Sequence, residues 1–109
     1  MKRYGMVIGI RADRIEEYRR LHREVWPAVQ AQIRRSGIRN YTIYLREPEG
    51  LLFSHFEHHG QDFEADMKAM AADPETQRWW TLCSPCQQPL TTRRPGEHWA
   101  ALDEIFHLD

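Results

Sequence analysis

The apolar and polar positions between residues 15 and 33 predict one long amphipathic helix. At about 100° of turn per residue, the apolar side chains of this segment form one wide stripe. The members of this stripe are Ile15, Tyr18, Leu21, Val25, Trp26, Val29 and Ile33. The opposite side carries Glu16, Glu17, Arg19, Arg20, Arg23, Glu24, Arg34 and Arg35. This separation of polarity is typical of a helix packed on a core, so we expect the stripe to be buried.

A histidine interrupts the apolar stripe, and a proline follows it closely. His22 projects into the middle of the stripe, with Tyr18 and Trp26 one turn away on either side. Pro27 lacks an amide hydrogen, and inside a helix it clashes with the carbonyl of Arg23 four residues earlier. We therefore expect a kink beside the histidine.

The two ends of this helix have recognisable signals. Asp13 is expected to cap its first turn, with Glu16 three residues on completing a capping-box pattern. The helix should run to about Arg35, because Ser36 and Gly37 form a stop signal of the glycine type.

Three segments read as β-strands. Residues 3–10 are rich in β-branched residues and end at a polar turn, and residues 38–46 and 51–58 flank the turn-forming sequence of residues 47–50. The last two should therefore form a hairpin. Both are apolar on both faces, which is unusual for a strand with one face in water. In the first, Tyr41, Ile43 and Leu45 oppose Asn40, Thr42 and Tyr44; in the second, Leu51, Phe53 and His55 oppose Leu52, Ser54 and Phe56.

The rest of the chain predicts two helices, a loop and a last strand. A helix that opens at residues 60–62 should end at Asp73-Pro74, where a third helix begins and runs to about Cys83. The first of these should pack inward Phe63, Met67, Met70 and Ala71. Three prolines make the next stretch a loop, and residues 102–108 could supply a final strand.

The order β-α-β-β-α-β is the ferredoxin-like pattern, an α+β fold with an antiparallel sheet and helices on one face. At 109 residues the chain should be a single domain, residues 1–109, with one core. Since the other sheet face is also apolar, the simplest cover for it is a second copy. We therefore expect a homodimer packed sheet to sheet, a dimeric α+β barrel.

The charge balance argues against nucleic acid and membrane partners. Lys and Arg number 15 against 16 Asp and Glu, and no basic run exceeds two residues. The apolar run of residues 6–10 is too short for a signal sequence or a membrane span, so we expect a cytoplasmic protein. Four Trp, four Tyr and four Phe raise the expectation of an apolar pocket for a small or uncharged ligand.

His22 and the pair Trp79-Trp80 are the first candidates for chemistry. A phenol such as that of Tyr18 can position a substrate hydroxyl for proton transfer by an imidazole. The alternative is a structural histidine that is buried in the core, with its hydrogen bonds satisfied and no part in catalysis. Adjacent tryptophans on a helix point about 100° apart, so one can face the core and the other a cleft. Paired tryptophans commonly bind the apolar face of a sugar, but two tryptophans that only pack in the core would give the same sequence pattern.

Cys83-Ser84-Pro85-Cys86 has the spacing of a redox or zinc motif, but its context fits neither. No second cysteine pair completes a zinc site, and a helix precedes the motif where a thioredoxin-like site has a strand. We expect two reduced thiols and no metal. No glycine-rich phosphate loop and no serine nucleophile elbow is present.

The sequence resembles the L-rhamnose mutarotase family nearly from end to end. The matching motifs are Glu17-Tyr18 with His22, Trp26-Pro27, Gly37, Asn40-Tyr41-x-Ile43-Tyr44-Leu45, Leu51-Leu52-Phe53, Gln77-Arg78-Trp79-Trp80 and Glu104-x-Phe106-x-Leu108. Two stretches depart from the family pattern: the helix of residues 62–73 is longer, and residues 83–95 differ in composition.

The resemblance implies a homodimer of ferredoxin-like protomers that interconverts the α and β anomers of L-rhamnose without cofactor or metal. It implies that His22 is the proton donor and that the substrate-binding residues are Tyr18, Tyr41, Trp79 and Trp80. A related 6-deoxy hexose such as L-fucose would need only small changes in the pocket. Two other classes stay open: a cofactor-independent oxygenase of the dimeric α+β-barrel type, and a non-catalytic sugar-binding module.

Overall fold

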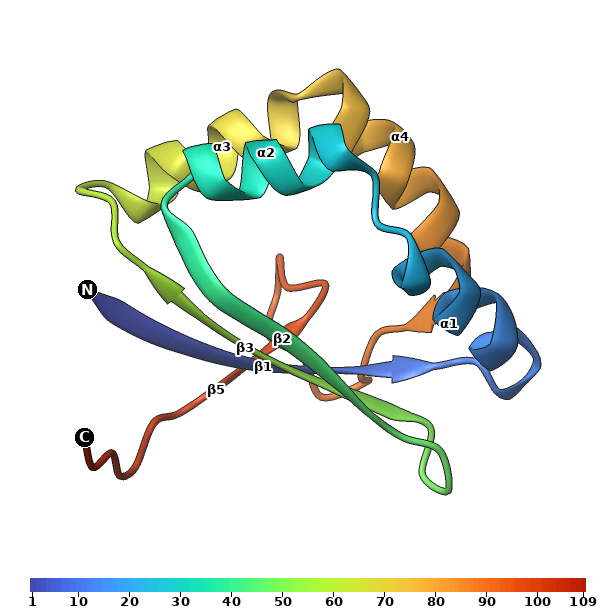
Figure 1. The fold of residues 1–109 in the computed structure, drawn as a ribbon. Helices are drawn as coiled ribbons and strands as arrows, with labels where there is room; N and C mark the ends of the chain where they lie inside the picture. The colour runs from blue at the N-terminus through green and yellow to red at the C-terminus, as the bar shows by residue number, and fades with distance from the viewer.

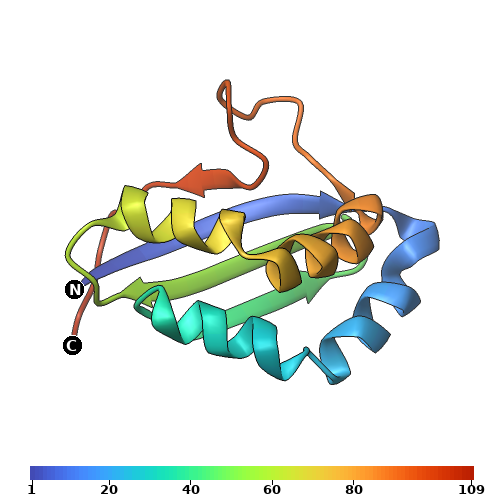
Figure 2. The ribbon, with the colours of Figure 1, turned by 90° about the horizontal axis from the view of Figure 1, so that it is seen from above.

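The protein is an α+β structure in which helices cover one face of an antiparallel sheet (Figures 1 and 2). The computed structural model describes residues 1–109. Its elements are β1 (Lys2–Ile10), a 3₁₀ turn (Ala12–Arg14), α1 (Ile15–Arg23), α2 (Pro27–Arg35), β2 (Ile38–Arg46), β3 (Leu51–His58), α3 (Phe63–Ala72), α4 (Pro74–Cys83), a second 3₁₀ turn (Ser84–Cys86), β4 (Gln87–Gln88) and β5 (Ala100–Leu102).

The sheet has the order β2-β3-β1-β4, and β5 also pairs with β1. All pairings are antiparallel. This confirms the ferredoxin-like α+β fold and the predicted division of the second helical connection at Asp73-Pro74, and the first helical connection is divided in two as well. None of the helices is long and apolar enough to cross a lipid bilayer.

The prediction of one continuous helix from residue 15 to residue 35 is wrong. The helix breaks at residues 24–26, and Pro27 becomes the first residue of α2. The first helical position is the one that suits proline best, because its missing N–H has no partner there in any case. The carbonyl of Val25, left outside both helices, accepts a hydrogen bond of 2.9 Å from Gln30 Nε2. Tyr18 and Val29 are still buried, so the apolar stripe survives the break.

Asp13 does not cap α1, which corrects a second expectation. The chain enters α1 through the 3₁₀ turn, and the residue before the helix, Arg14, makes no side-chain cap. Asp13 instead lies within that turn and pairs with Arg11, with Asp13 Oδ2 3.4 Å from Arg11 Nη2. The stop signal at the other end is confirmed, because Ser36 caps α2 and Gly37, the next residue, adopts a positive φ of 79°.

The hairpin of β2 and β3 lies where the sequence predicts it. Gly50 closes the turn with a φ of 67°, and its amide donates to the Glu47 carbonyl over 3.0 Å. The register shifts between Arg39 and Thr42, where Asn40 has a φ of 52°. This irregularity, a β-bulge that alternation along a strand does not reveal, lies directly before Tyr41.

Two expectations for the C-terminal half are wrong in detail. Ala71 is exposed, although Phe63, Met67 and Met70 of the same helix are half-buried. The final strand is β5 at residues 100–102, not residues 102–108. β5 pairs with Gly5–Val7 and runs toward the start of β1, so too little of β1 remains to pair with residues 103–108. Beyond β5, an ion pair of 3.0 Å joins Arg3 and Glu104.

One core lies between the sheet and the helices. Its ten buried residues are Ile8, Ile10, Ile15, Tyr18, Leu21, Val29, Leu52, Trp79, Cys83 and Cys86. On the opposite side of the sheet, a cross-strand row is formed by Tyr44, Phe53, Val7 and Ala100. We call this second side, to which Leu102 also belongs, the open face.

Candidate active site

A cavity of about 610 Å³ lies on the helix-covered face of the sheet. Its walls come from the last turn of α1, from α2, from the first half of β2, and from α3 and α4. Apolar side chains such as Val29, Ile33 and Met70 make up more than half of its lining. The volume falls in the usual range for small-molecule sites.

His22 lines this cavity and is held in one tautomer. Its Nδ1 donates to the Tyr18 carbonyl over 2.9 Å, one turn earlier in α1. Because Nδ1 carries the proton in this bond, Nε2 has the lone pair and is left for a ligand. Burial lowers the pKa of His22 below its ordinary value, and the bond to Tyr18 opposes part of that shift. Near neutral pH the ring is therefore a base.

Aromatic rings enclose the imidazole on two sides. The Tyr18 ring stacks on it at 4.2 Å between centroids, and the Trp79 ring meets it edge-on at 5.3 Å. Trp26 in turn packs edge-on against Trp79, also at 5.3 Å between centroids. The break between α1 and α2 places Trp26 there, so the helix break and the histidine environment are parts of one arrangement.

Tyr18 is not among the residues that line the cavity, but its ring packs on His22, which lines it. It is 5% exposed, and its hydroxyl oxygen accepts a hydrogen bond of 3.1 Å from Gln87 Nε2 in β4. Burial raises the pKa of Tyr18, and the nearby Tyr41 contributes to the rise. The phenol is thus neutral at neutral pH and remains a proton donor.

Tyr41 reaches the cavity from the bulge in β2. Its ring meets Phe56 edge-on at 5.6 Å between centroids, which fixes its direction. Burial raises the pKa of Tyr41 to about 12. The residue as a whole is 44% exposed, but the pKa responds to the surroundings of the hydroxyl rather than of the whole side chain. A neutral phenol is therefore present at this wall too.

The two adjacent tryptophans of α4 differ in their surroundings. Trp79 is 6% exposed and belongs to the core cluster, whereas Trp80 is 41% exposed. Both line the cavity. The 100° step of the helix thus places one ring in the core and the other at the mouth of the cavity.

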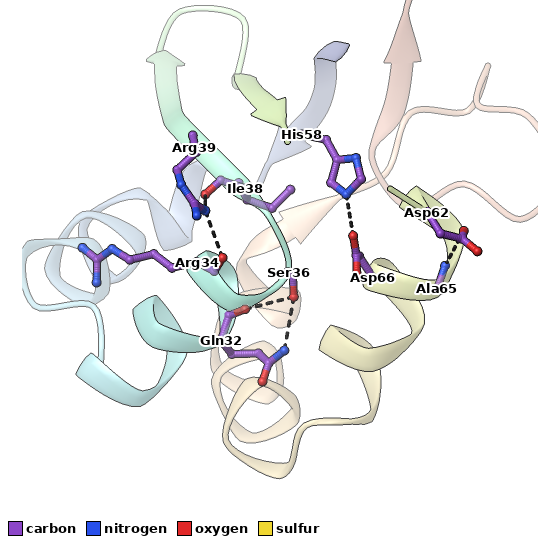
Figure 3. A network of polar contacts seen from close by, with 9 residues as sticks. All are labelled: Gln32, Arg34, Ser36, Ile38, Arg39, His58, Asp62, Ala65 and Asp66. Atoms are coloured by element: carbon purple, nitrogen blue, oxygen red, sulfur yellow. Dashed lines mark hydrogen bonds and ion pairs between the residues drawn. The ribbon is translucent and has the colours of Figure 1, made fainter. Parts of the chain in front are cut away.

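Several polar residues of the cavity were not predicted as site residues. They are Gln30, Arg34, Arg39, Asn40 and Thr76. Arg39 Nη1 donates to the carbonyls of Arg34 and Ile38, over 2.9 and 2.8 Å, and so closes the end of α2 (Figure 3). Asn40 could have been found, because it directly precedes Tyr41 in a family motif. Arg34 and Arg39 could not be recognised as site residues from the sequence, because the chain contains many other charged residues.

A polar network supports the wall behind Arg39 (Figure 3). Ser36 Oγ donates to the Gln32 carbonyl over 2.9 Å. On the neighbouring strand, buried His58 bonds to Asp66 of α3 over 2.7 Å. The first contact closes the last turn of α2, the second ties α3 to β3, and α3 contributes Met70 to the cavity.

The motif residues Cys83 and Cys86 are buried beneath the site. Burial raises the pKa of Cys83 to about 12 and raises that of Cys86 as well. Because the thiolate is the reactive form, both side chains behave as small apolar core residues.

Comparison with known proteins identifies the family. The family model described as L-rhamnose mutarotase matches residues 3–108, almost the whole chain. The chain belongs to the L-rhamnose mutarotase family. The L-rhamnose mutarotases of Bacillus subtilis and Shigella flexneri are 31% and 32% identical to it, and the alignments cover 100% and 99% of each chain. That of Oceanobacillus iheyensis is 30% identical over the full length of both chains.

Solved structures support the same fold for this mutarotase family member. The crystal structure of an L-rhamnose mutarotase from Formosa agariphila superposes with a TM-score of 0.78 at 17% identity. The tetracenomycin F2 cyclase of Streptomyces glaucescens, a type-II polyketide cyclase, superposes with a TM-score of 0.70 at 13% identity. Both matches cover all of each chain. At such low identity they describe the fold alone, a fold that other chemistries share.

Proposed function

We propose that this protein is a mutarotase that interconverts the α and β anomers of L-rhamnose, or of a closely related 6-deoxy hexose. The observation that carries the proposal is the environment of His22. Its Nε2 has no hydrogen-bond partner within the chain, its tautomer is fixed by the Tyr18 carbonyl, and it lines an aromatic cavity in a chain of the mutarotase family.

The proposed reaction moves one proton between two oxygens of the same sugar carbon. Neutral His22 takes the proton of the anomeric hydroxyl at Nε2, while the bond between C1 and the ring oxygen breaks and C1 becomes an aldehyde. The imidazolium then gives the proton to the ring oxygen, in the role of proton donor. A half-turn about the C1–C2 bond and the reverse steps close the ring on the other face. No proton, electron or group is gained or lost.

The remaining site residues orient the sugar in this proposal. The ring face of Trp80 at the cavity mouth suits the C–H face of a pyranose. The neutral phenols of Tyr41, which lines the cavity, and of Tyr18, which packs on His22, are donors for sugar oxygens. Because ring opening already occurs unaided in water, orientation beside one acid-base group is enough to accelerate it.

We propose in addition that the protein is a homodimer joined through its open faces. Tyr44 of this face is 63% exposed, and Phe53 and Leu102 are exposed too. The C-terminal segment leaves the sheet on the side away from the helices (Figure 1) and exposes Ile105, Phe106 and Leu108. An apolar surface of this kind marks an interface rather than a surface in water.

Saturation-transfer proton NMR on equilibrated L-rhamnose tests the function. Saturating the α anomeric proton should weaken the β signal much faster with protein than without it, and L-fucose, tested in parallel, measures how far the site accepts a related sugar. A protein that binds L-rhamnose without accelerating exchange would be a binding module. Oxygen uptake with an aromatic substrate, and no anomer exchange, would indicate the oxygenase class.

A further inference from the structure

Two polar residues outside the cavity form a hydrogen-bonded chain that ends on Tyr18. Gln87 Nε2 donates to the Tyr18 hydroxyl oxygen over 3.1 Å, and His98 Nε2 donates to Gln87 Oε1 over 2.8 Å. Gln87 lies in β4, which pairs with the end of β1, and His98 lies in the loop before β5. Gln87 thus lies within residues 83–95, whose composition differs from the family pattern, and His98 lies just beyond them.

The direction of these bonds decides where the proton of Tyr18 can go. The amide nitrogen of Gln87 is only a donor, so the phenol oxygen is the acceptor and its own proton must point elsewhere. Tyr18 is 5% exposed, and Gln87 is its hydroxyl's only hydrogen-bond partner in the chain. A buried O–H without an acceptor is costly, so this hydroxyl is prepared to donate to a ligand oxygen.

The position of Tyr18 indicates which ligand that is. Its ring stacks on the imidazole of His22, which lines the cavity. A sugar that meets His22 Nε2 would thus lie near the Tyr18 hydroxyl.

Resting on the proposed function, we infer that Gln87 is a positioning residue of the sugar site, which turns the Tyr18 proton toward a sugar oxygen. His98 holds the Gln87 amide in the donating orientation. If the amide were turned by half a rotation, Oε1 would accept the Tyr18 proton and withdraw it from the sugar. His98 would then have to offer a lone pair instead of a proton.

Substitutions of Gln87 test this inference through the anomer-exchange rate. Gln87→Met keeps the length of the side chain and removes both polar groups, so kcat/KM should fall about tenfold, the size expected for one misdirected hydrogen bond. Gln87→Glu should lose more, because its carboxylate can only accept and captures the Tyr18 proton. Gln88→Met, the neighbouring change in β4, is the matched control and should keep the wild-type rate.

A second background separates positioning from simple stabilisation of the fold. In a Tyr18→Phe protein there is no hydroxyl proton to direct, so Gln87→Met should cause no further loss of rate. His98→Leu, at an exposed position, should cost about threefold in the wild-type background and nothing in the Tyr18→Phe background. If Gln87→Met lowers the melting temperature by more than about 8 °C, and so disturbs the fold, His98→Leu serves as the second test of the inference.

The inference is overturned if Gln87→Met or His98→Leu exchanges anomers at the wild-type rate, or if Gln87→Glu is as active as wild type. Equal losses in both backgrounds would also overturn it, because they would show an effect that does not pass through Tyr18. These outcomes are distinct from failure of the proposed function, in which the wild-type protein itself does not accelerate exchange.

Discussion

The two faces of the sheet are both apolar, but they differ in what covers them and in the groups they hold. The helix-covered face carries the core, the cavity, and the acid-base groups of the site, His22, Tyr18 and Tyr41, whose pKa values depart from the ordinary. The open face carries Tyr44 and Phe53 as cross-strand neighbours, with no helix over it (Figure 1). Apolar composition alone therefore does not distinguish a site from an interface.

The difference lies in how the titratable groups are held. On the covered face, His22 has one nitrogen bonded and one free, inside an aromatic enclosure. Perturbed acid-base groups in a concave pocket are typical of active sites. On the open face, His55 stands in a cross-strand row with Gly5 and Thr42, without such an enclosure. The following predictions test this contrast.

The largest expected effect is on the rate of the His22→Leu protein. Leucine suits the apolar stripe, so the protein should fold and bind sugar weakly, but it should lose about two to four orders of magnitude in exchange rate, the usual share of general acid-base catalysis. The matched change on the open face, His55→Leu, should keep the rate. Saturation-transfer NMR measures both, and similar rates in the two variants would remove the distinction between the faces.

Trp79 and Trp80 should differ in kind. Trp79→Ala empties a core site and should cost about 3–5 kcal/mol of unfolding free energy. Trp80→Ala should chiefly raise KM, by about tenfold, because its ring lies at the cavity mouth, and should leave the melting temperature nearly unchanged. Thermal denaturation and anomer-exchange kinetics on both proteins decide. Equal effects of the two substitutions on both observables would contradict the assignment.

On the open face, Phe53→Asp should separate the proposed dimer. Light scattering of the wild-type protein at micromolar concentration should give twice the 13.0 kDa of one chain, and the variant should give the single mass. A charge in the centre of an apolar interface costs roughly 2–4 kcal/mol of association energy. A monomeric wild-type protein would contradict the proposal directly.

The smallest effect is expected for the cysteines. A Cys83→Ala/Cys86→Ala protein should exchange anomers at close to the wild-type rate, with and without reductant, because both thiols are buried and protonated. Rates that depend on reductant in the wild type and not in the variant would restore the dithiol hypothesis.

The sequence predicted the parts of this structure that local chemistry decides. The bounds of β2 and β3, the turn at Gly50 and the stop at Gly37 follow from alternation and from glycine's access to positive φ. The break at Pro27 was anticipated only as a kink, because a sequence does not say whether the chain bends or starts a new helix. That choice depends on Trp26 packing against Trp79 from another element.

The candidate site shows the same division. His22, Tyr41, Trp79 and Trp80 all line one cavity, whereas Tyr18 is not a lining residue and reaches the site only through its contact with His22. The contact between Tyr18 and Gln87 joins residues 69 positions apart and has no local pattern. Asp13 was likewise mispredicted. Its residue type suits a helix cap, but the chain forms a 3₁₀ turn at this position, so the side chain does not cap α1.

The most direct test of the central claim compares the titration of His22 with the pH dependence of catalysis. The His22 titration is followed by NMR of the imidazole in the free protein, assigned with the His22→Leu variant. Because burial lowers its pKa, His22 should be neutral at pH 7 and should gain its proton only below its ordinary value of about 6.5. As pH falls through that point, kcat/KM should fall with the same midpoint, since the base is lost. A kcat/KM that stays constant through the titration of His22 would contradict its role as the acid-base group.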